Sequence, residues 1–486
     1  MNVKDLFGII STDECFGYSP SSSSTKPAHI ANGWFRRLIG GAYDPVLLNS
    51  TMMHWIASQE ANRSEDLLEK NAGPFDAFAS EARLQDFVHF RADIRALLSP
   101  YGGAANRGND RSSYNITVKE HLTKDHADNS VGAFLYHLVN TAQQGAPSPI
   151  VEILVGILND GSDEVSSLTL PLTRAVPQSP VNVPSYPAPG VFRKSKDDFS
   201  SLCLRNLRQG FNQLATYEHT HGGGVEALRR SVAFGVFAVM LHMVNRSKEL
   251  RKEKGLTPML LYFQGRKRNT AYYASNQTYR DCRQAIEFTY TEKFREKIAG
   301  RIGESPTAKQ CQALIKQMEF GKVNENEARR LEVGNLFIAY RSTEDDPLGA
   351  LSSATKDVVF RMMSGDPTEF YRGLGVRVGF LKPTGGARKY FTLDGVLLEA
   401  VLGTVVSKQE LPYREFLDTL YSRYGLLTGG RPEDADLLLE EGIDQVTVED
   451  LRENSASLRH QLVAMGWARA YADGVMTVCM PNGGLA

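Results

Sequence analysis

Two histidines separated by one residue, His219 and His221, follow Glu218 in the stretch YEHTHGGG. Imidazoles at this spacing, with a carboxylate, can hold zinc or manganese, as a metal-dependent hydrolase or nuclease requires. The preceding LCLRNLRQGFNQLATY has helical apolar spacing, however, and the three glycines are typical of a helix end. The pattern therefore favours a polar helix terminus. A catalytic site of His219, His221 and Glu218 is the alternative, and we expect no metal or other cofactor.

A basic segment between residues 246 and 268 holds eight cations against two carboxylates, a net charge of +6. The cations are Arg246, Lys248, Arg251, Lys252, Lys254, Arg266, Lys267 and Arg268. Five aromatic residues lie within it or just beyond: Tyr262, Phe263, Tyr272, Tyr273 and Tyr279. Cations release counterions from a phosphate backbone and exposed aromatic rings stack on bases, so the combination is suited to DNA or RNA. A charged turn that keeps an edge hairpin soluble is the alternative.

Residues 260–283 are predicted to form a strand, a basic turn at 265–269 and a second strand. Successive side chains in a strand point to opposite faces, so about half of the aromatic residues are expected in the core. A second hairpin is predicted at 372–393, where Val376, Val378 and Phe380 alternate before a Pro-Thr-Gly-Gly turn.

The last hundred residues contain three helical patterns, at 393–406, 412–425 and 448–466, and then a hairpin at 468–481. Asp473-Gly474 stands between its two alternating runs, as a tight hairpin turn requires. Three helices followed by a hairpin resemble a winged-helix domain over residues 393–481, although the insertion RPEDADLLLEEGIDQ is longer than that family's turn.

In DNA-binding winged helices the third helix enters the major groove. Here residues 433–453 hold nine acidic residues against one arginine, a net charge of −8 that repels phosphate. We therefore expect this domain to bind a protein partner. The candidate partner-binding residues are Arg452, Asn454, Arg459 and His460.

The positions of these candidates depend on the organisation of the whole chain. Its 486 residues are too many for one compact core. We predict a mainly α, multidomain (α+β) protein with small β hairpins. The expected domains are a mostly helical one at 1–173, a linker or arm at 174–192 with five prolines, a helical middle domain at 193–390 with the basic segment, and the winged-helix-like domain at 391–486. Helical patterns also occur at 65–70, 81–98, 131–143, 197–218, 225–254, 280–299, 306–319 and 324–334.

Composition indicates the compartment. The net charge of −1 predicts no global attraction to nucleic acid or an acidic membrane. Five scattered cysteines without a C-x-x-C pair favour a reducing cytoplasm. The apolar run at 231–244 is too short to span a bilayer, which predicts a buried core helix and no membrane partner.

The sequence lacks G-x-x-x-x-G-K-[ST], G-x-S-x-G and H-E-x-x-H, which favours a non-catalytic role and leaves enzymatic activity open. The leading hypothesis is a non-catalytic subunit of a bacterial multi-protein assembly that acts on nucleic acid. The basic middle region would contact phosphates and the acidic C-terminal domain would bind another subunit. In overall layout the chain is similar to uncharacterised subunits of bacterial anti-phage defence systems. The alternatives are the metal-dependent hydrolase and a purely structural oligomer.

Overall fold

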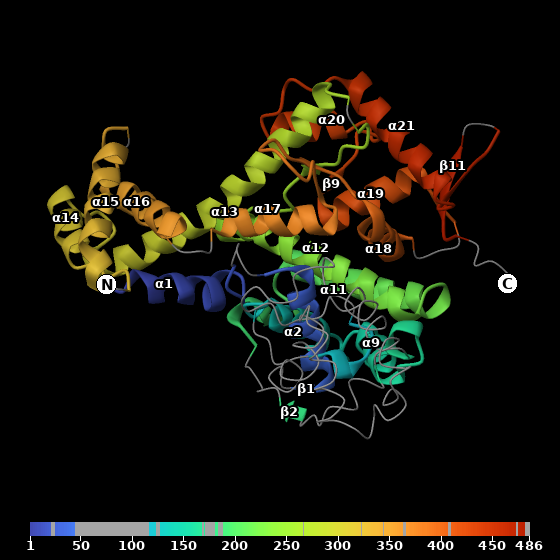
Figure 1. Ribbon diagram of the computed structural model, residues 1–486. Coiled ribbons are helices and arrows are strands. Elements are labelled where there is room, and N and C mark those ends of the chain that lie inside the picture. The colour runs from blue at the N-terminus through green and yellow to red at the C-terminus, as the bar shows by residue number, and fades with distance from the viewer. Residues whose placement is uncertain are drawn as a thin grey trace, which may run out of the picture.

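The structure is a computed structural model. It describes residues 1–20, 25–43, 116–122, 127–167, 170, 180–182, 188–265, 267–321, 323–343, 345–362, 366–406, 410–472 and 475–481. In these ranges the chain is mainly α-helical with five small sheets, as predicted. A lobe extends from the remainder of the molecule at the end of one long helix (Figure 1).

The N-terminal part of the molecule packs around the helices α2 (Pro27–Ile39) and α8 (Val131–Asn140). It also contains α1 (Val3–Ile9), the π-helix η1 (Ile10–Cys15), the 3-10 helix η4 (Lys119–His121) and α9 (Ile150–Asp160). Helices α2 and α8 touch backbone to backbone, because a Cβ on Gly132 would lie 2.3 Å from the carbonyl carbon of Gly33. The predicted helix at 131–143 is confirmed. Those at 65–70 and 81–98 lie outside the described residues.

The predicted proline-rich linker is described only in part. Within it, β2 (Pro180–Asn182) pairs antiparallel with β1 (Gly41–Tyr43), and the 3-10 helix η5 (Gly190–Phe192) follows. The strands β3 (Lys194–Ser195) and β4 (Asp198–Phe199) then form a short hairpin that leads into the first long helix.

Two long helices form the centre of the molecule. They are α11 (Leu202–Thr220) and α12 (Gly224–Arg251), separated at the predicted glycine-rich break. Within the described part of the chain, α12 is the one helix that is long and apolar enough to cross a membrane, but 89% of its apolar window is buried inside the protein. The prediction of a buried core helix is confirmed.

A buried histidine on α12, His242, predicts a pH-dependent stability. Its ring stacks on Phe134 with 4.9 Å between centroids, and burial lowers the pKa of His242 to about 4. The unfolded chain binds this proton below about pH 6.5, whereas the folded protein binds it only near pH 4. Stability should therefore fall between these values, by up to about 3 kcal/mol from this group.

Urea unfolding of the wild type and His242→Phe at pH 7, 5.5 and 4.5 measures this contribution. We expect a shallower loss of stability with acid in the variant. If the stability of the wild type and that of the variant fall in parallel as the pH is lowered, His242 is not responsible for the loss of stability in acid.

The segment 260–283 is not a hairpin, so the prediction of a second strand is wrong. The strand β5 (Met259–Leu260) is followed by a turn and then by α13 (Thr270–Ile302). Asn269 caps this helix, since its side-chain oxygen accepts a hydrogen bond from the Tyr272 amide at 3.2 Å. The partner of β5 is a distant strand, with Met259 opposite Leu426 in parallel register. The expected burial of aromatic residues holds for Tyr262, Tyr272 and Tyr279.

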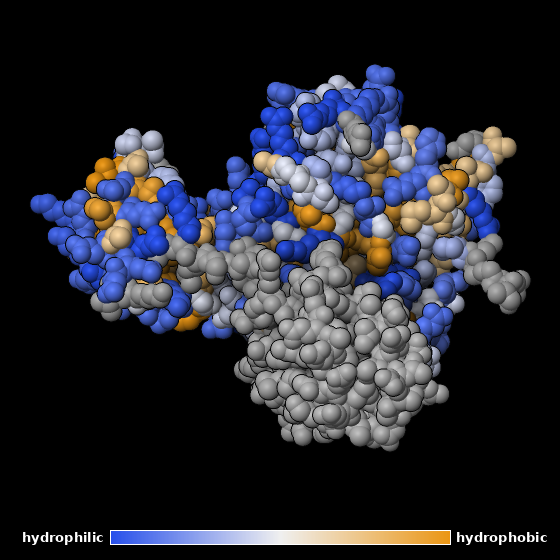
Figure 2. All heavy atoms as spheres, viewed as in Figure 1, coloured by the Kyte–Doolittle hydropathy of each residue, from blue (hydrophilic) through white to orange (hydrophobic). Residues whose placement is uncertain are grey.

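After α13 come α14 (Ala308–Lys316), α15 (Val323–Arg341) and α16 (Pro347–Met362), which form the protruding lobe. The predicted helices at 306–319 and 324–334 are confirmed. The N-terminus lies against the lobe, since the Val3 amide donates to the Glu319 carbonyl at 2.7 Å. Hydrophobic side chains appear on the lobe surface (Figure 2), where α15 exposes Leu331 by 66% and Ile338 by 62%.

The predicted hairpin at 372–393 is correct only in its second half. Strands β6 (Leu381–Lys382) and β7 (Tyr390–Phe391) pair antiparallel. Val376 and Val378 belong instead to α17 (Pro367–Val378), because Asp366 caps its N-terminus and Gly379, at φ 82°, ends it.

The C-terminal part contains the predicted helices and hairpin. These are α18 (Gly395–Val405), β8 (Glu410–Pro412), α19 (Tyr413–Tyr424), β9 (Leu426–Leu427), α20 (Asp434–Glu440), α21 (Val448–Ala464), β10 (Ala468–Ala470) and β11 (Met476–Cys479). Strand β9 is the parallel partner of β5, while β8, β10 and β11 form one antiparallel sheet in the order β10-β11-β8. Helix α18 packs against α11 and α12, so one continuous hydrophobic core includes residues from the N-terminal helices to β11.

Candidate nucleic-acid interface

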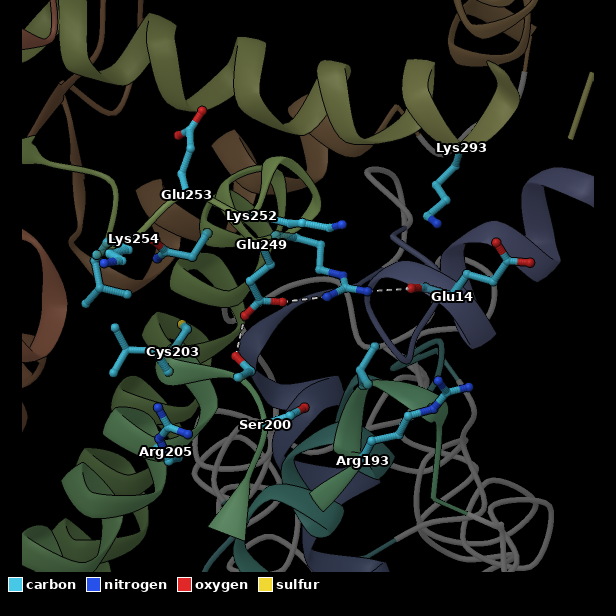
Figure 3. A pocket seen from close by; sticks show the side chains of 18 of the residues that line it. Glu14, Arg193, Ser200, Cys203, Arg205, Glu249, Lys252, Glu253, Lys254 and Lys293 are labelled. Carbon is cyan, nitrogen blue, oxygen red and sulfur yellow. Dashed lines mark hydrogen bonds and ion pairs between the residues drawn. The ribbon is translucent and has the colours of Figure 1, made fainter. Parts of the chain in front are cut away.

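A cleft of 730 Å³ opens where the end of α12 meets the start of α11 and the middle of α13 (Figure 3). Six cations line it: Arg193, Arg205, Arg246, Lys252, Lys254 and Lys293. The carboxylates along its walls are Asp13, Glu14, Glu249 and Glu253. The lining therefore has an excess of positive charge in a chain whose net charge is −1.

The end of α12 places two of these cations. Helix α12 ends in the left-handed residue Lys252, at φ 57°, and the chain turns again at Gly255, at φ 83°. This turn brings both Lys252 and Lys254 to the cleft wall. In Figure 3 the amine of Lys252 extends across the opening, and Lys293 reaches toward it from α13.

The first turn of α11 forms the facing wall. Ser201 caps this helix by accepting a hydrogen bond from the Leu204 amide at 3.2 Å, and its hydroxyl donates to Glu249. Glu249 also binds Arg246 at 2.5 Å, and Arg246 donates to the Glu14 carbonyl at 3.0 Å. These bonds hold the walls together. The positive end of the 19-residue helix dipole adds to the attraction for an anion.

Three cleft cations are not neutralised by a neighbour. Within the described part of the chain, no ion pair joins Arg193, Lys252 or Lys254 to a carboxylate. Arg205 lies 4.0 Å from Asp198, and Lys293 pairs with Glu296 at 2.6 Å. The cleft can therefore exchange water and counterions for phosphate oxygens at three side chains without breaking an internal ion pair.

The remaining residues of the predicted basic segment lie elsewhere. Lys248 pairs with Glu441 at 3.1 Å, and Arg251 pairs with Glu253 at 2.8 Å. Lys267 pairs with Glu453 of α21, and Arg268 lies 6.0 Å from the centre of the Tyr272 ring. Arg266 falls outside the described residues. The structure thus brings together Arg246, Lys252 and Lys254 but separates them from the basic turn.

The basic turn and the acidic C-terminal segment contact each other at the surface of the molecule. Besides the Lys267–Glu453 pair, the Thr270 amide donates to Asp450 at 2.9 Å. This bonding holds the pKa of Asp450 below its usual range, with the Thr270 side chain the largest cause. Part of the charge contrast seen in the sequence therefore joins two parts of one chain.

The candidate partner-binding residues divide into two groups. Arg452, Arg459 and His460 are exposed on α21, where the Arg459 guanidinium lies 4.9 Å from the centre of the Tyr413 ring. Asn454 is fully buried and lies behind that surface. It accepts from the Phe263 amide at 2.8 Å and donates to the Leu261 and Thr428 carbonyls at 2.7 and 3.0 Å.

Sequence reasoning missed Arg193, Arg205 and Lys293. They lie about 40 to 60 residues from the cations they join, so no local pattern links them. The cluster Arg193-Lys194-Ser195-Lys196 after the prolines was the available signal, because four residues with three cations rarely lie in a core.

The histidines stand at a helix end, as the favoured interpretation predicts. His219 and His221 are exposed at the end of α11. Glu218 is buried and bound by both ends of the Arg230 guanidinium, at 2.7 and 2.9 Å, and by the Gly223 amide at 3.0 Å. Its carboxylate is thus occupied. Within the described residues, no group of three or more His, Cys, Asp and Glu side chains is placed to hold a metal ion.

We expect the double variant His219→Ala, His221→Ala to fold normally, with a change in unfolding free energy below about 0.5 kcal/mol, because both side chains are exposed. Metal analysis of the purified wild type and variant by mass spectrometry tests the catalytic alternative directly. Stoichiometric zinc or manganese in the wild type that is lost in the variant would contradict this assignment.

Comparison with protein-family models, with curated proteins and with solved structures finds no match to this chain.

Proposed function

We propose that this protein is a non-catalytic subunit of a bacterial assembly that acts on nucleic acid, and that the cleft contacts the phosphate backbone. The observation that carries the proposal is the set of three cations, Arg193, Lys252 and Lys254, that line one cleft without an ion-pair partner among the described residues. A phosphate backbone binds several cations along a groove favourably, because each contact releases a condensed counterion.

The attraction is local. A protein of net charge −1 does not draw nucleic acid by its total field. At a Debye length of about 8–10 Å, the cleft cations attract phosphate close to their own positions. Glu441 of the acidic segment comes near the end of α12, where its carboxylate is paired with Lys248.

The C-terminal part is proposed to be a winged-helix domain that binds another subunit. Its order of helix, strand, two main helices and hairpin supports this, as does the strand order β10-β11-β8. Val463, Tyr471 and Val475 are exposed on α21 and beside the hairpin strands, which suits a protein surface better than phosphate. The exposed Leu331 and Ile338 on the lobe offer a further apolar contact for a subunit.

The proposed location is the cytoplasm, and anti-phage defence is the proposed setting. All five cysteines are buried and free, which is the state that a reducing compartment maintains. The defence setting rests on the resemblance in overall layout alone.

Fluorescence anisotropy of labelled 12-nucleotide RNA and DNA strands and a 12-base-pair duplex, titrated with the whole protein across a salt series, tests the proposal. We expect binding that weakens linearly in a plot of log affinity against log salt concentration. Absence of binding to every oligonucleotide at low salt would overturn the proposed function.

A further inference from the structure

A second pocket, of 370 Å³, lies along the first turns of α13, apart from the cleft. Its walls come from α13, from the end of the β6–β7 hairpin and from the loop after α20. The α13 residues Tyr273, Gln277 and Arg280 are four and three residues apart, so they share one face of the helix. Arg388 and Asp444 face them from the other walls.

Tyr273 is the exposed member of the aromatic group at 262–279. Tyr262, Tyr272 and Tyr279 are buried and Phe263 is half-buried, whereas Tyr273 is 51% exposed. The Tyr273 ring stands edge-on to Tyr272, with 5.3 Å between centroids and 82° between planes. This contact supports the ring while half of the side chain remains accessible. A supported, exposed ring is what a base needs as a stacking platform.

Two arginines bring positive charge to the same pocket. Among the described residues, no ion pair joins Arg280 or Arg388 to a carboxylate, and Asp444 is the acidic residue of the pocket wall. A planar guanidinium can donate two hydrogen bonds to one phosphate group. The pocket thus offers an aromatic face and two phosphate donors together.

The loop that carries Arg388 is held in place. Asn276 of α13 donates to the Lys389 carbonyl at 2.6 Å, and the Lys389 amine donates to the carbonyls of Pro383, Thr384 and Gly385 at 2.5, 3.2 and 3.1 Å. These bonds close the hairpin loop and fix it beside α13. The backbone that carries Arg388 is therefore positioned before any ligand arrives, which lowers the entropy that the loop loses on binding.

We propose that this pocket binds one nucleotide of a single-stranded nucleic acid, with its base stacked on Tyr273 and its phosphate held by Arg280 and Arg388. The volume is near the lower limit for ligand sites and suits one nucleotide. Bases in a duplex are stacked on each other and cannot offer a face to a side chain, so the ligand is a single strand. This inference rests on the proposed function, and it specifies the substrate class.

The cleft and the pocket both border α13, where Lys293 of the cleft follows Tyr273 of the pocket by about 30 Å along the helix axis. Lys248 on α12 precedes Lys252 of the cleft by one helical turn. Its amine binds Glu441, the residue next to Gly442 of the pocket wall. One ion pair thus connects the elements that carry the two sites, and a strand that spans both would leave several nucleotides between the cleft and Tyr273.

The test measures, by fluorescence anisotropy, the affinity of the whole protein and its variants for the same single strands and duplex. The variants are Tyr273→Leu, Tyr273→Phe and the double variant Arg280→Ala, Arg388→Ala. We expect Tyr273→Leu to weaken single-strand binding about 10-fold with an unchanged salt slope, because it removes stacking and no charge. Tyr273→Phe should bind as the wild type does. The arginine variant should reduce the salt slope by about 0.7, because the two arginines hold one phosphate.

Tyr471→Leu is the matched control, because Tyr471 is also an exposed tyrosine and lies far along the chain next to β10. We expect it to leave binding unchanged. If Tyr273→Leu binds single strands with wild-type affinity, the proposed pocket site is wrong and the proposed cleft site is unaffected. The same conclusion follows if Tyr273→Leu loses affinity equally for single strands and for the duplex. A wild type that binds no oligonucleotide would overturn the proposed function and this inference with it.

Discussion

Replacing Arg193, Lys252 and Lys254 together with alanine should weaken single-stranded nucleic-acid binding on the order of 100-fold at 0.1 M salt. Each phosphate contact contributes about 0.7 to the slope of log affinity against log salt concentration, so the slope should become shallower by about 2. Anisotropy titrations at four or more salt concentrations measure both quantities. The three side chains line the cleft with no ion-pair partner among the described residues, so their loss should not disturb the fold.

A second triple variant, Lys248→Ala, Arg251→Ala, Lys267→Ala, is the matched control. It removes the same number of positive charges, all of them from the basic segment 246–268, but these side chains pair with Glu441, Glu253 and Glu453. We expect at most a small loss of affinity and nearly the same salt slope as the wild type. Equal losses of affinity in both triple variants would indicate attraction by total charge. Unchanged affinity in the cleft variant would show that the cleft is not the binding site.

The second large effect is on stability, at Asn454. Replacing it with alanine should lower the free energy of unfolding by about 3–4 kcal/mol. The change leaves the Phe263 amide and the Leu261 and Thr428 carbonyls without their partner, in a place where Asn454 itself is 0% exposed. An unsatisfied buried group costs about 1–3 kcal/mol. Urea unfolding followed by circular dichroism measures the loss.

Asn454→Asp separates hydrogen bonding from packing, because it keeps the side-chain volume but removes both donors to the carbonyls. We expect it to destabilise the protein at least as much as alanine does. Asn335→Ala, at an exposed position on α15, is the matched control and should change stability by less than about 0.5 kcal/mol. Unfolding curves for Asn454→Ala that coincide with the wild type would contradict the role assigned to this residue.

Local patterns in the sequence were reliable guides to the helices and the last hairpin. The apolar run at 231–244 lies in the buried helix α12, and the strands β10 and β11 of the predicted C-terminal hairpin pair antiparallel. Helical spacing and turn residues act between neighbours in the chain, so they can be read without knowledge of the fold. The segment after Asn269 is a helix and not the predicted second strand. Tyr262 and Tyr272 are buried in a cluster with residues from distant strands and helices, so their burial is not the mark of a hairpin.

The charges were less predictable. A basic segment of +6 and an acidic one of −8 suggested two separate surfaces, yet Lys267–Glu453 and Lys248–Glu441 join them. Ion pairs between residues almost 200 positions apart depend on how helices pack, and no spacing in the sequence encodes that. The domain limits predicted at 174–192 and 391 remain predictions.

The sequence by itself determined that the chain is mainly helical, with a buried central helix and free cysteines. It also determined that cations are concentrated around residue 250. These features depend on composition and on contacts between near neighbours. The tertiary structure alone decided which cations are available. Packing of α12, α13 and the segment after η5 placed Lys252, Lys293 and Arg193 in the lining of one cleft, and the ion pair with Glu453 of α21 occupied Lys267. A side chain is available for a phosphate when the fold supplies no nearer carboxylate, and the distances that decide this exist only after the chain has folded.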